Sequence, residues 1–129
     1  MDFFDRLKNA SSKEQHLDWA NLSYYWRDNE KLIESSGGKD KIIFMGDSIT
    51  EELGRLSPEF FQTVVFVNRG IGGQTTPQML LRFKQDVINL NPYIVFILAG
   101  TNDIAGNTGP SSIDMICLLY TSPSPRDTL

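Results

Sequence analysis

A serine lies directly after an acidic residue at the end of an apolar run, in the segment FMGDSIT at residues 44–50. In this position the hydroxyl of Ser48 could attack an ester or another acyl group. A serine hydroxyl is a weak nucleophile at neutral pH and needs a base to accept its proton. The single histidine of the chain, His16, lies in a separate polar segment near the N-terminus. The segment itself therefore leaves open which group would activate Ser48.

Two further segments have the composition of a site that stabilises negative charge. NRGIGGQTT, at residues 68–76, contains three glycines, whose backbone N–H groups can approach a ligand without a Cβ in the way. GTND, at residues 100–103, supplies the side-chain amide of Asn102. Acyl transfer requires a hydroxyl that faces such donors, because its tetrahedral intermediate carries an oxyanion.

Each segment also has a simpler structural explanation. Gly-Asp-Ser is common at a turn that ends in a helix N-cap, Gly-Ile-Gly-Gly is common in tight loops, and GTND alone could form an Asx turn. Asp47 and Asp103 have no spacing that indicates a metal site, so structural hydrogen bonds explain their carboxylates better. The chemical interpretation therefore depends on the three segments lying together.

The elements that must position these segments are three short apolar runs. They are KIIFMG at 41–46, TVVFVNRG at 63–70 and YIVFILAG at 93–100. Apolar runs without alternation are typical of parallel strands that are buried on both faces. Helices are predicted between them, at 49–56 and at 75–92, where a stripe of Leu80, Phe83, Val87 and Leu90 could cover the sheet.

The order strand, helix, strand, helix, strand predicts a doubly wound α/β unit. In open α/β sheets, ligands bind beyond the carboxyl ends of the strands, and all three segments follow such an end. Residues 1–40 are predicted to form a separate N-terminal helical segment, because apolar residues recur at helical spacing between 13 and 35.

The three ordered segments resemble the conserved blocks of the SGNH or GDSL hydrolases. GDSIT is similar to the serine block, NRGIGGQTT to the glycine block and GTND to the asparagine block. The resemblance spans residues 41–116, and DWANLSYYW at 18–26 is similar to the N-terminal segment of bacterial acylhydrolases in this group. It implies a flavodoxin-like three-layer α/β/α sandwich with the first strand between the second and third. Residues 41–116 would be a partial domain, with three strands present and two more expected.

The resemblance also implies a reaction and a role for three residues. Ser48 would be the nucleophile, and its N–H, the N–H of Gly73 and the side chain of Asn102 would form the oxyanion hole. The implied function is hydrolysis of carboxylic esters, as in carbohydrate esterases and the acetylhydrolases of platelet-activating factor. No cofactor is implied, since acyl transfer by serine needs none. The family's Asp-x-x-His block, which supplies the base, has no counterpart here, and His16 is a poor substitute.

The C-terminal segment differs from the rest of the chain. A helix is predicted to begin at Ser111–Asp114, which has capping-box spacing, but the two prolines of TSPSPRD cannot continue it. CLLYTSPSPRD, residues 117–127, matches the in-frame translation of a transposase-based sequencing-library adapter. We therefore expect residues 117–129 to be a non-native tail, with the natural protein known only through about Ile116 and its base encoded beyond.

Composition limits the partners of the protein. A length of 129 residues suits one domain or part of one. The formal net charge of −4 provides no basic surface for nucleic acid. No stretch approaches the roughly 20 apolar residues of a membrane helix, and no signal peptide is evident, so we expect a cytoplasmic protein without a membrane partner. The oligomeric state is not indicated.

Two other functions fit the same three segments. The glycine-rich loop also suits a non-catalytic module that binds a small ligand or phosphate, although the chain has neither a phosphate-loop motif nor a dinucleotide fingerprint. A non-catalytic interaction domain is the third alternative. The sequence favours the esterase, acting on a small-molecule or carbohydrate ester.

Overall fold

The computed structural model describes residues 16–35, 40–62 and 65–121. Within these residues the strands are β1 (Lys41–Gly46), β2 (Phe66–Gly70) and β3 (Pro92–Leu98). The helices are α3 (Trp26–Ser35), α4 (Ser48–Leu56), α5 (Thr76–Asp86), α6 (Thr101–Ile104) and α7 (Ile113–Tyr120). Short 3₁₀ helices are η1 (His16–Asp18), η2 (Pro58–Phe61) and η3 (Ile88–Leu90).

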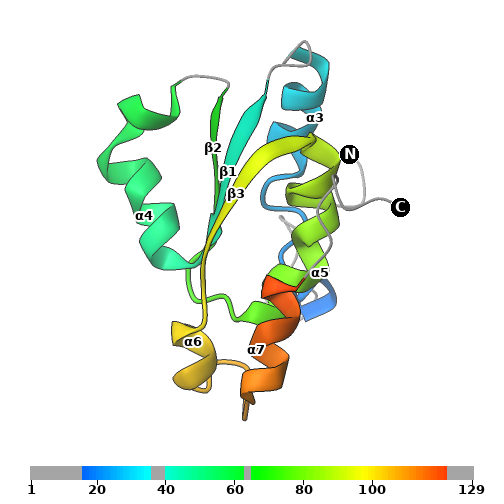
Figure 1. Ribbon diagram of the computed structural model, residues 1–129, viewed down its shortest axis with the longest axis vertical. Coiled ribbons are helices and arrows are strands. Elements are labelled where there is room, and N and C mark those ends of the chain that lie inside the picture. The colour runs from blue at the N-terminus through cyan, green and yellow to red at the C-terminus, as the bar shows by residue number, and fades with distance from the viewer. Residues whose placement is uncertain (1–15, 36–39, 63–64, 122–129) are drawn as a thin grey trace.

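The sheet lies between two layers of helices (Figure 1). α4 packs against one face of the strands, whereas α3, α5 and α7 lie on the opposite side. All strand pairs of the described sheet are parallel. The predicted α/β fold, a three-layer α/β/α sandwich of which three strands are described, is therefore confirmed.

The strand order brings the three predicted site segments to one edge. The order is β2-β1-β3, which confirms that the first strand lies between the other two. In the register, Gly46 at the end of β1 pairs with Gly70 on one side and with Leu98 on the other. The three strands thus end level with one another, and the segment that follows each of them begins at the same rim.

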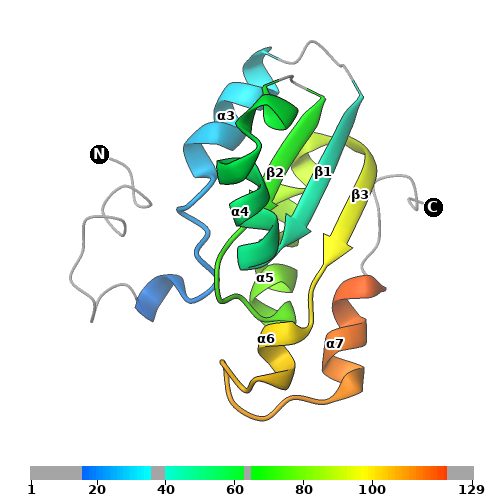
Figure 2. The same cartoon turned by 90° about the vertical axis from the view of Figure 1, so that its left-hand side faces the viewer.

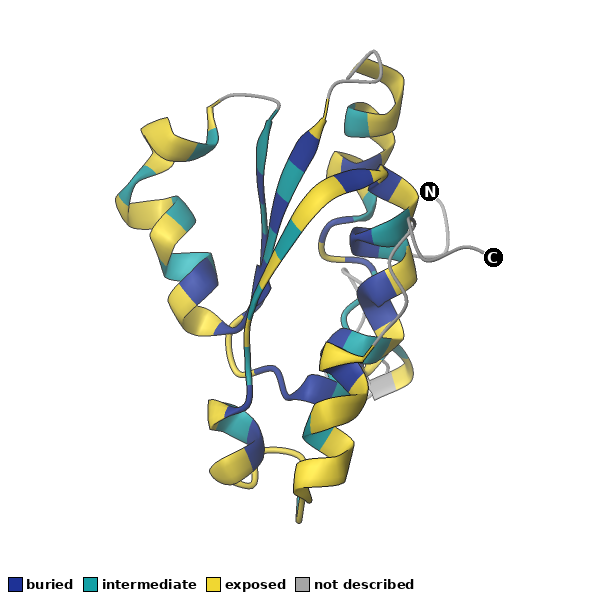
Figure 3. Cartoon of the chain, in the orientation of Figure 1, coloured by how far each residue is buried: buried dark blue, intermediate teal, exposed yellow. Residues whose placement is uncertain are grey.

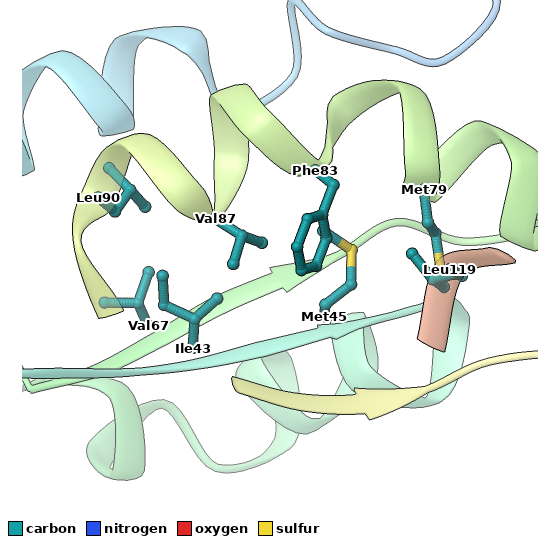
Figure 4. Close-up of a cluster of buried hydrophobic side chains, with 8 residues drawn as sticks. All are labelled: Ile43, Met45, Val67, Met79, Phe83, Val87, Leu90 and Leu119. Carbon is teal, nitrogen blue, oxygen red and sulfur yellow. The ribbon is translucent and has the colours of Figure 1, made fainter. Parts of the chain in front are cut away.

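One hydrophobic core fills the space between the sheet and α5 (Figure 4). Its buried members are Ile43, Met45, Val67, Met79, Phe83, Val87, Leu90 and Leu119. Alternate residues of β1 point into this core, as the period of a strand requires. Each large apolar side chain that is fully buried contributes about 1.5–3 kcal/mol to folding, so this face stabilises the sheet.

The helix predicted at 75–92 is shorter than expected. α5 ends at Asp86 and is followed by η3, and Asn91 then adopts a left-handed φ of 54° before Pro92 begins β3. Proline disfavours helical backbone in the residue that precedes it, and asparagine tolerates the left-handed region, so the helix cannot continue through Asn91. The apolar stripe also begins earlier than predicted, because Met79 is fully buried whereas Leu80 only borders the core.

The expectation that every strand is buried on both faces is wrong for β3. Ile94, Phe96 and Leu98 are 38%, 52% and 55% exposed (Figure 3). They lie on the face of the sheet that carries α4, but α4 and η2 pack against β1 and β2. The ring of Phe44 stacks on Phe96, with the centroids 5.2 Å apart. β3 is therefore an edge strand with an exposed apolar face.

We expect this edge to cause self-association of the chain. An exposed apolar edge strand is a site of strand pairing between molecules, and a charge on it opposes that pairing. Ile94→Lys should therefore lower the apparent mass measured by light scattering at a given concentration. Leu81→Lys adds the same charge at an exposed position of α5 and should have a smaller effect. Equal effects of the two substitutions would contradict the role of the edge.

The chain before β1 and the end of the chain are only partly described. Of the predicted N-terminal segment 1–40, α3 is helical and residues 1–15 lie outside the described residues. α7 is capped by Ser112, not by Ser111, since the Ser112 hydroxyl accepts a hydrogen bond from the N–H of Met115 at 3.2 Å. The helix runs on to Tyr120, and residues 122–129 again lie outside the description. The non-native tail stays a prediction.

No helix within the described ranges has both the length and the apolar composition that crossing a membrane demands.

Candidate active site

Ser48 lies at a sharp turn between the central strand and a helix. It is exposed and is the first residue of α4. Asp47 is the N-cap, and its buried carboxylate accepts a hydrogen bond from the N–H of Ile49 at 3.1 Å. Gly46 is required here, because a Cβ would lie 2.2 Å from the Thr50 hydroxyl oxygen. The helix N-terminus favours negative charge close to the serine.

The glycine loop after β2 lies beside the serine. An added Cβ at Gly72 would be 3.7 Å from the Cβ of Ser48, so the two residues are neighbours. The N–H of Gly72 donates to the carboxylate of Glu51 at 3.4 Å, which connects the loop to α4. Gly73 is exposed and has a φ of 76°, which a residue with a side chain rarely adopts.

The loop after β3 is joined to the glycine loop through side chains. The Asn102 amide nitrogen donates to the carbonyl of Gln74 at 3.0 Å. The buried carboxylate of Asp103 accepts hydrogen bonds from the backbone N–H of Thr76, at 3.0 and 3.1 Å, and from its hydroxyl at 2.6 Å. Both aspartates for which a metal role was considered therefore accept hydrogen bonds at the start of a helix.

The three residues predicted for the site lie on one rim of the sheet. Figure 2 shows the strands pointing toward one end, where α4 begins and α6 lies. Ser48 lies beside Gly72 of the glycine loop. Gly73 follows Gly72 in the sequence, and the side chain of Asn102 donates to the carbonyl of the next residue, Gln74. The assignment of Ser48, Gly73 and Asn102 to catalytic roles stays a prediction, and the fold brings their backbones to the same place.

A buried ion pair on α5 lies close to the rim, and the sequence pattern did not predict it. Arg82 and Asp86, one turn apart on α5, are both fully buried, with Nη1 and Oδ2 3.2 Å apart. Arg82 also donates to the Gln74 side chain at 2.6 Å and to the carbonyl of Gly46 at 3.4 Å. Burial lowers the pKa of Arg82, and the charge of Asp86 opposes this shift. Arg82 thus connects the end of β1 with the glycine loop, and Asp86 holds its charge in place.

The N-terminal segment DWANLSYYW forms hydrogen bonds with the end of β2 and with the glycine loop. The Tyr25 hydroxyl donates to the carbonyl of Gly70 at the end of β2. Burial raises the pKa of Tyr25 well above its ordinary value, so this hydroxyl stays protonated and can donate. The guanidinium of Arg69 lies 4.6 Å from the centroid of the Tyr25 ring, which is a cation–π contact. The Gln74 side chain donates to the carbonyl of Ala20 at 2.7 Å.

An apolar cavity of about 640 Å³ opens on the other side of Ser48, between α4 and the exposed face of β3. Besides Ser48, its walls include Phe44, Ile49, Leu53 and Phe96. It is continuous with the part of β3 that α4 leaves uncovered.

Two neighbouring glycines should respond differently to alanine. A Cβ at Gly70 would lie 2.3 Å from the backbone nitrogen of Glu51, so Gly70→Ala must push the start of α4 away from β2. Overpacking of this kind costs about 1–3 kcal/mol of unfolding free energy. At Gly72 an added Cβ makes only ordinary contacts, and Gly72→Ala should change stability little. Urea unfolding measures both, and equal losses would contradict this packing.

Comparison with known proteins agrees with the fold and with the three segments. The family model of the GDSL-like lipases and acylhydrolases matches residues 44–116, which is more than half of the chain. A solved GDSL-like lipase from Bacteroides thetaiotaomicron is 44% identical, with a TM-score of 0.71 over 78% of this chain and 51% of that chain.

Two curated relatives are also similar. An acetylxylan esterase of Geobacillus stearothermophilus is 33% identical over 53% of this chain and 42% of its own length. The human platelet-activating factor acetylhydrolase IB subunit alpha2 is 28% identical over 58% of this chain and 34% of its own length. The chain thus spans about half the length of the solved relative and less of the curated ones. The matched region contains all three segments that suggested the resemblance, and the chain belongs to the GDSL-like lipase/acylhydrolase family.

Proposed function

We propose that this chain carries the nucleophile and the oxyanion hole of a serine ester hydrolase. The observation that carries the proposal is the common rim. Ser48 follows β1 and adjoins the glycine loop, and Asn102 after β3 contacts that same loop. A hydroxyl, backbone N–H groups and a side-chain amide in one place are the groups that acyl transfer uses.

The proposed reaction begins with attack of the Ser48 oxygen on the ester carbonyl carbon, while a base accepts the hydroxyl proton. The carbonyl oxygen becomes an oxyanion, which accepts hydrogen bonds from the N–H of Ser48, the N–H of Gly73 and the amide of Asn102. The first N–H groups of a helix have no partner within it, so that of Ser48 is free to donate. The intermediate collapses to an acyl-serine as the protonated base gives its proton to the leaving alcohol. The base then takes a proton from water, which attacks the acyl-serine, and the acid leaves as the serine oxygen regains a proton.

The base is proposed to lie outside these 129 residues. The only histidine, His16, is the first residue of η1 and is followed by no Asp-x-x-His pattern. Loss of the catalytic histidine of a serine protease lowers turnover by about 10⁶, and what remains comes from the oxyanion hole and from binding. We therefore expect this chain alone to hydrolyse esters very slowly.

Short acyl groups, with acetyl first, are the proposed substrate class. The names of two relatives, an acetylxylan esterase and a platelet-activating factor acetylhydrolase subunit, both denote removal of an acetyl group. The alcohol part would be a small molecule or a carbohydrate. The proposed reaction uses no cofactor, because the serine forms the covalent intermediate itself.

Hydrolysis of 4-nitrophenyl acetate with added imidazole tests this function. Imidazole would replace the absent base, and Ser48→Ala measures the hydrolysis that imidazole causes by itself. We expect a Ser48-dependent excess only when imidazole is present, and a smaller excess with the octanoate ester. Equal rates for the unsubstituted chain and Ser48→Ala would contradict the nucleophile. Rapid Ser48-dependent turnover without imidazole would contradict the external base.

A further inference from the structure

Asn107 contacts both of the loops that supply the proposed oxyanion hole. Its amide nitrogen donates to the side-chain oxygen of Asn102 at 2.9 Å and to the carbonyl of Gly73 at 3.3 Å. An amide nitrogen carries two hydrogens, so one is available for each acceptor. A single side chain thus joins the two donor residues that do not belong to α4.

The orientation of both amides follows from their partners. A backbone carbonyl only accepts hydrogen bonds, so the atom of Asn107 that faces Gly73 is its nitrogen. By the same argument the nitrogen of Asn102 faces the carbonyl of Gln74, at 3.0 Å. The oxygen of Asn102 is therefore turned toward Asn107, and its NH₂ group is turned toward the glycine loop. Within the described part of the chain the second hydrogen of that group has no acceptor, so it is available to a ligand.

The backbone around Asn107 is folded back by glycines. Gly106 and Gly109 have φ values of 75° and 91°, and the N–H of Gly109 donates to the carbonyl of Gly106 at 3.0 Å. The N–H of Asn107 donates to the carbonyl of Asn102 at 3.1 Å. Asn107 thus has a fixed backbone relative to Asn102, which limits the freedom of its side chain.

We propose that Asn107 is a positioning residue for the oxyanion hole. This inference rests on the function proposed above. Gly73 has no Cβ and a φ of 76°, so its backbone is free to rotate unless a contact restrains it. The bond from Asn107 to its carbonyl is such a contact, and the bond to Asn102 holds the amide in one orientation. Preorganised donors are effective because they need not reorganise during the reaction.

The test is the reaction of Ser48 with a fluorophosphonate in imidazole buffer, followed by mass spectrometry of each serine peptide. Asn107→Ala should lower the maximal rate of Ser48 labelling by about tenfold, a fraction of the loss caused by removing a donor outright. The concentration for half-maximal rate should stay the same. Asn107→Asp should lower the rate further, because a carboxylate would face the oxygens of Gly73 and Asn102. The midpoint of thermal unfolding should change little, since the bonds of Asn107 are exposed.

Two controls separate positioning from stabilisation of the fold. Thr108→Val removes a different side-chain hydrogen bond between the same loops, from Thr108 to Thr75 at 3.1 Å, and should leave Ser48 labelling unchanged. In a double-mutant cycle, Asn107→Ala should have less effect when Asn102 is already alanine, because contacting residues that act together are not additive. A full Asn107 effect in that background would overturn the inference.

The outcomes also distinguish this inference from the proposed function. Labelling of Ser48 that is no faster than that of the exposed Ser111 and Ser112 would overturn the function, and the inference with it. Selective labelling of Ser48 that Asn107→Ala leaves unchanged would overturn the inference alone. So would a loss of labelling in Asn107→Ala that is matched by a loss of thermal stability.

Discussion

Asn102→Ala is expected to slow the phosphonylation of Ser48 by about 10²–10³-fold, which is the typical loss when one oxyanion-hole donor is removed. The side chain donates to the carbonyl of Gln74 and accepts from Asn107, so its amide is held between two loops. The developing negative charge on the phosphoryl oxygen would lose a fixed donor. The rate constant of labelling, measured by mass spectrometry on the Ser48 peptide, checks this result.

An asparagine away from the rim supplies the control for this experiment. Asn89 is exposed on η3, and Asn89→Ala should leave the labelling rate unchanged. Circular dichroism of both variants shows whether the fold is retained. A loss of less than about twofold for a folded Asn102→Ala would mean that this amide does not serve the oxyanion, in contrast to the large losses that such donors cause.

The second large effect is expected at the buried ion pair of α5. Asp86→Ala should lower the unfolding free energy by about 3–5 kcal/mol, because removing one partner leaves a buried charge uncompensated. Arg82 and Asp86 are both 0% exposed, and the Asp86 carboxylate also accepts from the Asn29 amide at 2.7 Å. The charge of Asp86 further stabilises the protonated form of the buried Arg69 and opposes the fall of its pKa. Urea unfolding measures the loss.

The matched control is the ion pair between Glu52 and Arg55 on α4. It has the same chemistry, three residues apart instead of four, but both side chains are exposed to solvent. Exposed pairs contribute little because water screens them. Glu52→Ala should therefore leave the midpoint of unfolding nearly unchanged. Comparable shifts for Glu52→Ala and Asp86→Ala would show that burial of the Arg82 pair does not govern its contribution.

The site segments could be found in the sequence because each carries a local signal. Ser48 lies in a Gly-Asp-Ser sequence at the end of an apolar run, and the two later segments follow similar runs. Since parallel strands end at one edge, strand order and register were enough to bring them together. The close packing of Gly46 against Thr50 also agrees with the turn that the Gly-Asp-Ser sequence predicted before the helix.

The supporting network could not be predicted, because its partners are distant in sequence. On α5 the apolar Leu81 is 61% exposed, whereas the adjacent Arg82 is fully buried, the reverse of what hydrophobicity predicts. Arg82 is buried because its hydrogen bonds reach Gln74 and the end of β1. Asn107 gave no signal either, since an asparagine between glycines is an ordinary loop residue.

The apolar run of β3 favours burial on both faces, and the exposure of one face has a related reason. An apolar run predicts that a strand can be buried, but it does not show that a covering element is present. Phe96 and Leu98 lie where α4 does not reach, so they are exposed. In the central strand the prediction was confirmed for the face toward α5, where Ile43 and Met45 are fully buried, whereas Ile42 and Phe44 on the other face are half-buried.

A crystal structure of the chain after reaction with a fluorophosphonate tests the central claim most directly. The adduct fixes a phosphoryl oxygen where the oxyanion of an ester would form. We predict a covalent bond to the Ser48 oxygen, with the phosphoryl oxygen about 2.7–3.1 Å from the nitrogens of Ser48, Gly73 and the Asn102 side chain. An adduct on Ser48 whose phosphoryl oxygen points into solvent, away from Gly73 and Asn102, would contradict the account.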